Sequence, residues 1–277
     1  MISVLFASLA SFIDEVSSSI IKFETVHKKE TVYTAGFINT LFGILVFLAI
    51  AAFRNSFVFS LASLPTFAIK AALEIFQAQA SMLAIMKTDR STYAFVRNIT
   101  IPLLLATDLL LGFTVSSGQW IGITLIFATF FFIILFHILN TKGIGYSLFT
   151  AMNAVATISL FKYNITHFNS VEAEQIATLL ILLIYFFLAA RFLARENPLF
   201  FLRYGTFLGQ GFAHSIASIF GSFAIAFGNP GIATAAGRAS SVLAGIISGH
   251  NYFQEKKFGA KIIVSAALIA GLALLTR

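Results

Sequence analysis

Two arginines stand inside apolar stretches of the chain, where a charged side chain is costly. Arg97 begins the sequence RNIT and Arg238 begins the sequence RASS. Because a guanidinium group keeps its proton, each arginine needs a carboxylate, a backbone carbonyl or an anionic ligand beside it. Two interpretations stay open. Either each arginine pairs with an acid such as Glu74, Asp14 or Asp108, or the two together hold a carboxylate or phosphate group of a solute.

Other polar side chains inside apolar stretches fall at helical spacing. Lys70, Glu74 and Gln77 share one face of a helix, and the first two either neutralise one another or contact the solute. Asp14 either belongs to an acidic helix end near lipid headgroups or couples transport to a proton or cation. His214 either makes a structural hydrogen bond or acts in function.

The residues that we predict to bind a solute are Asp14, Glu74, Gln77, Arg97, Asn153, His214 and Arg238. The other histidines lack the spacing of metal ligands, and the chain has no cysteine. We therefore expect no metal, no cofactor and no catalytic group. Lys22 and Lys162, near predicted helix ends, are expected to extend to the membrane interface.

The composition indicates what must position these residues. Hydrophobic residues make up 58% of the 277 residues and charged residues 10%, and 33 positions are Phe. A soluble domain carries about 25% charge and cannot bury this much apolar surface. The chain is therefore predicted to be a membrane protein that crosses the bilayer several times. Its net charge of +7 belongs to connections beside the membrane, and we expect no nucleic-acid partner.

Apolar runs separated by charges, Gly or Pro predict ten membrane-spanning helices. The runs are too long and too uniformly apolar for barrel strands, so the fold class is all-α. The predicted spans are residues 2–21, 31–53, 57–86, 91–113, 119–139, 144–163, 173–194, 203–227, 231–252 and 259–275.

The chain divides into two halves of five spans each, residues 1–140 and 141–277. Lys22 and Lys162 occupy matching positions, and so do Arg97 and Arg238. Because five is an odd number, the second half enters the membrane from the opposite side. This predicts two inverted five-helix repeats, the architecture of alternating-access carriers.

The last part of the chain resembles a known family. Residues 238–245 (RASSVLAG) and 249–257 (GHNYFQEKK) are similar to the ninth span of EamA-type transporters in the drug/metabolite transporter superfamily. Pro102 and residues 118–122 (GQWIG) form a weaker counterpart in the first half, where residues 116–117 (SS) replace the family's Glu. The resemblance implies ten helices in two inverted repeats, with spans one to four and six to nine lining a central cavity.

The orientation has two conflicting predictions. Basic residues gather in the connections after the odd-numbered spans, and the positive-inside rule then places those connections in the cytoplasm and both termini outside. The family resemblance implies that both termini lie inside. We favour the charge distribution.

The sequence thus predicts a secondary active transporter of the plasma or inner membrane, an exporter or exchanger that moves a small polar organic metabolite by alternating access. No nucleotide-binding motif is present, so ATP is not expected to drive it. Besides lipid, the expected partner is an anionic or zwitterionic solute, and the expected assembly is a monomer. The alternatives are an ion channel or facilitative pore and, with less support because no acid/base cluster is visible, an enzyme acting on lipids.

Overall fold

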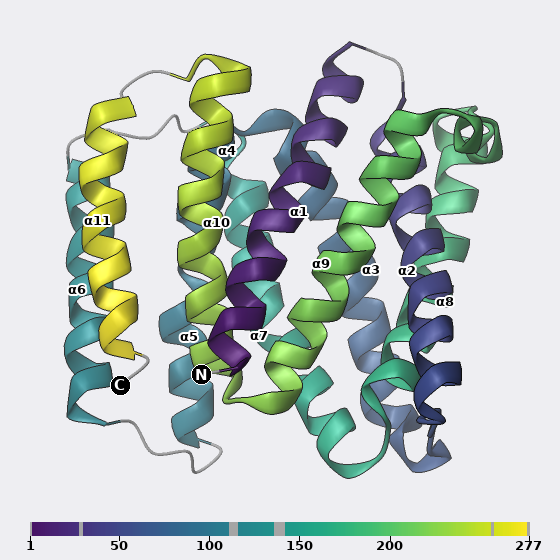
Figure 1. Cartoon of the computed structure of the whole chain (residues 1–277), viewed down its shortest axis with the longest axis horizontal. Coiled ribbons are helices and arrows are strands. Elements are labelled where there is room, and N and C mark those ends of the chain that lie inside the picture. The colour runs from purple at the N-terminus through teal and green to yellow at the C-terminus, as the bar shows by residue number, and fades with distance from the viewer. Residues whose placement is uncertain (1, 28–29, 111–115, 136–141, 256–257, 276–277) are drawn as a thin grey trace.

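A computed structural model describes the chain except residues 1, 28–29, 111–115, 136–141, 256–257 and 276–277. The described part is helical throughout, with short connections and no strand. Figure 1 shows the helices standing side by side, with both chain ends near the same end of the molecule. The all-α prediction is confirmed.

The α-helices are α1 Ile2–Val26, α2 Val32–Arg54, α3 Leu64–Lys87, α4 Arg90–Arg97, α5 Thr100–Leu110, α6 Ser117–Leu135, α7 Ile144–His167, α8 Val171–Leu188, α9 Gly205–Phe227, α10 Pro230–Phe253 and α11 Phe258–Leu275. Three short helical turns complete the described part, η1 Leu61–Ser63, η2 Ala189–Leu193 and η3 Pro198–Arg203.

Each predicted span coincides with helical structure, but the span predicted at 91–113 is broken. α4 ends at Arg97, and α5 begins at Thr100. Pro102 explains the break, because its ring clashes with the carbonyl four residues earlier, that of Asn98. The Asn98 side chain donates hydrogen bonds to the carbonyls of Ala94 and Phe95, which the interrupted helix leaves without their usual donors.

Two other boundaries differ from the prediction. The predicted third span began at residue 57, whereas α3 begins at Leu64, with Pro65 in the first turn, where its missing N–H costs nothing. The predicted first span ended at residue 21, whereas α1 continues to Val26. Lys22 therefore lies within a helix and not beyond its end.

Within the described residues, six helical segments are long and apolar enough to cross a membrane: residues 2–26, 32–54, 144–167, 171–193, 205–227 and 230–253. Large apolar side chains on these helices, such as Phe53, Ile184 and Phe212, point away from the protein interior. A bilayer accommodates such a surface, whereas water does not. The protein is therefore a multi-pass membrane protein.

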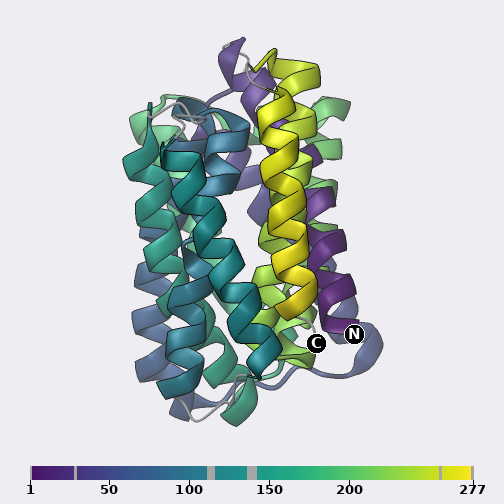
Figure 2. The ribbon, with the colours of Figure 1, turned by 90° about the vertical axis from the view of Figure 1, so that its left-hand side faces the viewer.

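Helices from the two halves of the chain pack against each other. α1 packs on α9 and α10, α7 packs on α3, α4 and α5, α2 packs on α8, and α6 packs on α11. Figures 1 and 2 show α6 and α11 side by side at one edge of the molecule. Gly245 lets α10 approach α4 closely, since a Cβ there would meet the Arg90 carbonyl oxygen at 3.2 Å.

Candidate functional site

A cavity of about 250 Å³ lies where α1, α4, α9 and α10 meet. It collects polar side chains from all four helices, among residues far apart in the sequence. Its lining consists of Ala10, Ser11, Asp14, Glu15, Ser18, Arg90, Tyr93, Arg97, His214, Ala217, Ser218, Arg238 and Ser241. We refer to this as the central cavity.

Arg97 and Arg238 line the central cavity without a hydrogen-bonding or ion-pairing partner among the described residues. In each, Nε is buried and finds no hydrogen-bond acceptor, and neither arginine forms an ion pair with a described side chain. The side chain of Asp108, one predicted partner, lies outside the described part. Arg97 instead packs over Tyr93, with its guanidinium carbon 4.9 Å from the ring centre.

Arg90 is a third arginine in the lining, and it is only partly satisfied. Its Nε lies 3.0 Å from Glu15 Oε1 and its Nη2 lies 2.6 Å from Glu15 Oε2. This is a bidentate contact between a guanidinium group and a carboxylate. Its Nη1 is buried and has no acceptor among the described residues. Arg90 also packs on Tyr93 at 5.6 Å, so one aromatic ring contacts two arginines.

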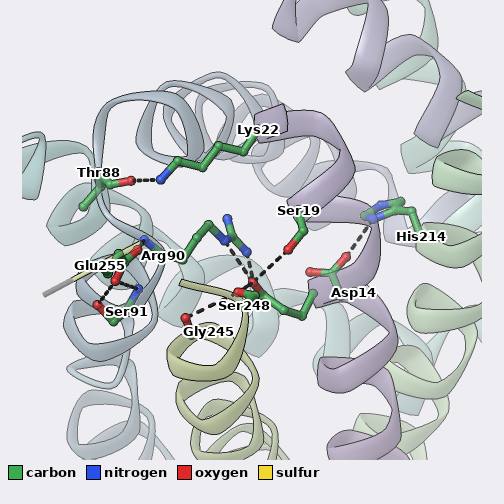
Figure 3. Close-up of polar contacts among 11 residues, drawn as sticks. Asp14, Ser19, Lys22, Thr88, Arg90, Ser91, His214, Gly245, Ser248 and Glu255 are labelled. Carbon is green, nitrogen blue, oxygen red and sulfur yellow. Dashed lines mark hydrogen bonds and ion pairs between the residues drawn. The ribbon is translucent and has the colours of Figure 1, made fainter. Parts of the chain in front are cut away.

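Three helices hold Glu15, whose partners Ser19, Arg90 and Ser248 are labelled in Figure 3. Besides the Arg90 contacts, it accepts hydrogen bonds from Ser19 of α1 and Ser248 of α10. The Glu15 carboxylate is therefore fully engaged by Arg90, Ser19 and Ser248. Asp14, one residue earlier, points elsewhere and lies 2.9 Å from His214 Nδ1.

A second polar cluster lies at the end of α3. Glu255 accepts hydrogen bonds from the backbone N–H groups of Arg90 and Ser91, from the Ser91 hydroxyl and from Lys261. Burial alone would raise the pKa of Glu255, but these donors outweigh it and hold the pKa below the ordinary value. The carboxylate thereby caps the first turn of α4, the helix that carries Arg90 and Arg97.

Lys22 and Lys162 were predicted to extend to the membrane interface, but both make hydrogen bonds within the protein. Lys22 is buried and donates to the Thr88 carbonyl at the end of α3. Lys162 donates to the carbonyls of Ile225, Ala226 and Gly228 at the end of α9. Each lysine satisfies carbonyls that a helix C-terminus leaves without donors, which is worth more than partial contact with water.

The structure brings four of the seven predicted site residues together, namely Asp14, Arg97, His214 and Arg238. Gln77 and Asn153 lie outside the lining of the central cavity, and their side chains hydrogen-bond to each other between α3 and α7. Glu74 also lies outside the lining of the central cavity.

Lys70 pairs with an acid that the sequence did not suggest. Its Nζ lies 3.2 Å from Glu174 Oε1 and donates to Thr178, both on α8, so it does not neutralise Glu74. Asn164 and Asn169 complete the shell around the Glu174 carboxylate. This cluster is a matched buried ion pair that joins α3, α7 and α8.

Sequence reasoning missed Arg90 and Tyr93 because Arg90 was assigned to a connection. A usable signal was present, since positions 90, 93 and 97 share one face of a helix. The Asp89 N-cap places Arg90 in the first turn of α4, and all three side chains then face the central cavity.

The central cavity continues toward the end of α9. A second cavity of about 150 Å³ shares Ala10, Ser11 and Arg238 with it and continues to Ala224 and Ile225 near the end of α9. In the opposite direction lie the contact of Arg90 with Glu15 and the contact of Lys22 with Thr88.

Comparison with protein-family models and with curated proteins gives no match to this chain. The fold therefore defines the class, a helical multi-pass membrane protein with an interior polar cavity.

Proposed function

We propose that this protein is a secondary transporter, of the ten-span EamA type, that moves a small anionic or zwitterionic metabolite across the plasma or inner membrane. One observation carries the proposal. Buried nitrogens of Arg90, Arg97 and Arg238, three residues lining one cavity, have no acceptor among the described residues. A buried donor without a partner costs about 1–3 kcal/mol, and more when it is charged. An anionic ligand would supply the missing acceptors.

The charge of the central cavity favours the same ligand. The charged residues of its lining are three arginines and two carboxylates. Their formal charges of +3 and −2 give a net charge of +1 when His214 is neutral. Glu15 is engaged by Arg90, and Asp14 lies against His214. The guanidinium groups of Arg97 and Arg238 thus remain for a carboxylate or phosphate group, which a planar fork binds in a bidentate manner.

Helix packing supports the inverted repeat on which alternating access would rest. When the first five spans are exchanged with the second five, α1 corresponds to α7, and α3 corresponds to α9. The contact of α1 with α9 then corresponds to that of α7 with α3. The contact of α1 with α10 likewise corresponds to that of α7 with α4 and α5. The contacts of α2 with α8 and of α6 with α11 map onto themselves. Such an exchange is what a pseudo-two-fold axis in the membrane plane produces.

The two lysine contacts give the same relation at atomic detail. Lys22 donates to the carbonyl of Thr88, and Lys162 donates to that of Gly228. The two lysines are 140 positions apart in the sequence (162 − 22), and so are the two acceptor residues (228 − 88). The two junctions lie at opposite ends of α1, because Ser3 at its start contacts Ala224 and Lys22 near its end contacts Thr88. Matching contacts at opposite ends are expected of inverted halves.

Variants of Arg97 and Arg238 test the proposal. Arg→Lys keeps the charge but loses the fork, so uptake of an anionic solute into proteoliposomes should weaken while the melting temperature stays near that of the parent. Arg→Leu should abolish specific uptake. A matched control is Arg203→Leu, because Arg203 is exposed and packs on Phe200 away from the central cavity. A well-folded Arg238→Leu protein with unchanged uptake would contradict the role of that residue.

The same vesicles separate the carrier from the ion channel or pore. A carrier saturates and shows counterflow, in which internal unlabelled solute accelerates entry of labelled solute. Linear, unsaturable flux without counterflow would favour the channel.

A further inference from the structure

A second space, lined mainly by apolar side chains, adjoins the central cavity. It encloses about 560 Å³ between α1 and α10, with Thr206 from the start of α9. Its lining is Phe12, Glu15, Val16, Ser19, Ile20, Phe23, Glu24, Thr206, Ala244, Ile247, Ser248, Tyr252 and Phe253. We call it the apolar groove.

The apolar groove opens toward the lipid. Val16 of α1 is 54% exposed and Ile247 of α10 is 51% exposed, and both line the groove. Aromatic rings from both helices, those of Phe12, Phe23 and Tyr252, add to its walls. Apolar walls of this kind receive an apolar group and offer little to a charged one.

The apolar groove and the central cavity share one lining residue. Glu15 lines both spaces, and its carboxylate is neutralised by Arg90 on the side of the central cavity and bound by Ser248 from the groove wall. The boundary is therefore an ion pair without net charge. An anion bound to Arg97 and Arg238 would meet no repulsion there.

The sizes of the two spaces suggest a ligand that occupies both. Sites for organic ligands usually enclose roughly 300–1,000 Å³, and the central cavity at about 250 Å³ is smaller than this. The apolar groove alone falls within the range, but no basic residue stands in its lining.

We infer that the solute is an amphipathic anion, whose carboxylate or phosphate group binds Arg97 and Arg238 while its apolar body lies in the groove between α1 and α10. This inference rests on the proposed function and specifies its substrate class. The groove gives such a ligand direct access from the bilayer, past Phe12 and Ile247.

Binding of two homologous series tests the inference. The probes are n-alkyl phosphates and n-alkyl carboxylates from one to six carbons, titrated against the protein in nanodiscs, with empty nanodiscs subtracted. Burial of one methylene group is worth about 0.8 kcal/mol, or roughly a fourfold gain in affinity. In the series whose headgroup binds, affinity should rise by about that factor per carbon.

Filling the groove should remove the gain in affinity with chain length and leave binding of the headgroup unchanged. Ile247→Trp should bind the one-carbon probe as the parent does, yet show little increase with chain length. Leu45→Trp is the matched control, because Leu45 of α2 is 53% exposed and does not line the groove; it should keep the full gain. Arg238→Leu should lose binding of every chain length.

Three results would overturn the inference. Equal affinity for short and long probes would mean that ordinary lipid chains fill the groove, with the proposed anion transporter left intact. A chain-length gain that survives in Ile247→Trp would locate the apolar body elsewhere. Failure of every probe to bind would remove the inference together with the proposed function.

Discussion

At the scale of single residues, the charges inside the protein fall into two groups. Glu15 with Arg90, and Lys70 with Glu174, are matched in the folded chain, whereas Arg97 and Arg238 are not matched by any described side chain. The first group stabilises the fold only as pairs, because each member alone would be a buried charge. The second group is available to a ligand.

The matched pair of Glu15 and Arg90 should therefore respond to single and double substitutions differently. Arg90→Leu leaves the Glu15 carboxylate buried without its partner, so stability should fall by roughly 3–5 kcal/mol. Adding Glu15→Gln should recover most of that loss. Thermal melting in detergent measures both changes. An Arg90→Leu protein as stable as the parent would show that Glu15 does not depend on Arg90.

Glu30, in the connection between α1 and α2, predicts a dependence of stability on pH. Burial, with the negative charges of Glu24 and Glu196, raises its pKa from 4.5 to about 8. Between these values the folded chain holds a proton that the unfolded chain has lost, so stability should fall as pH rises from about 4.5 to about 8.

Glu30→Gln should flatten this decline, because an amide keeps its hydrogens at every pH in the range. Melting temperatures of the parent and the variant, recorded at intervals from pH 5 to about 9, provide the comparison. Identical slopes would show that Glu30 is ionised in the folded protein near neutral pH.

The sequence could predict the residues that carry an intrinsic cost in the bilayer, but not their partners. Arg97, Arg238, Asp14 and His214 were recognisable because a polar group within an apolar run needs a reason to be there. Gln77 and Asn153 carry the same signal, yet they satisfy each other across α3 and α7. Which polar group meets which depends on helix packing, and the spacing along one helix does not contain that information.

At the scale of elements, two lysines fix the ends of two helices. Lys22 and Lys162 bind carbonyls at the C-termini of α3 and α9. Lys→Met at either position keeps the apolar stem but leaves these carbonyls without a donor, which should cost about 1–3 kcal/mol. Melting temperatures test this, and Lys87→Met is the control, because Lys87 is exposed and contacts only Tyr146 among described residues.

If the halves are inverted repeats, the losses at Lys22 and Lys162 should be similar in size. A large loss at one position and none at the other would show that the two junctions are not equivalent, and it would weaken the case for the repeat.

The elements themselves were largely predictable, because apolar runs bounded by charge, Gly or Pro define where a helix can cross a membrane. The break between α4 and α5 was not predicted, although Pro102 is visible in the sequence. Proline is tolerated inside membrane helices when neighbours satisfy the freed carbonyls. Here the Asn98 carbonyl accepts from the Ile101 N–H, and the Asn98 side chain donates to the carbonyls of Ala94 and Phe95. A pattern of hydropathy does not report such contacts.

At the scale of the whole molecule, the absence of cysteine makes single-cysteine labelling clean. Phe57, between α2 and α3, and Phe200, between α8 and α9, are both exposed. If the basic connections are cytoplasmic, an impermeant maleimide added outside intact cells should label Phe57→Cys and spare Phe200→Cys. The reverse pattern would place the termini inside, as the family resemblance implies.

The same reagent tests access to the central cavity. Ser11 lines both this cavity and its continuation toward the end of α9, while the contacts of Glu15, Arg90 and Lys22 lie in the other direction. Ser11→Cys should therefore react with maleimide added on the face that labels Phe57→Cys, and not on the face that labels Phe200→Cys. An alternating-access carrier should change this preference when its solute is added, since solute binding favours the exchange between inward and outward states. Equal labelling from both faces without solute would mean a continuous passage, and the channel would then be the better description of this protein.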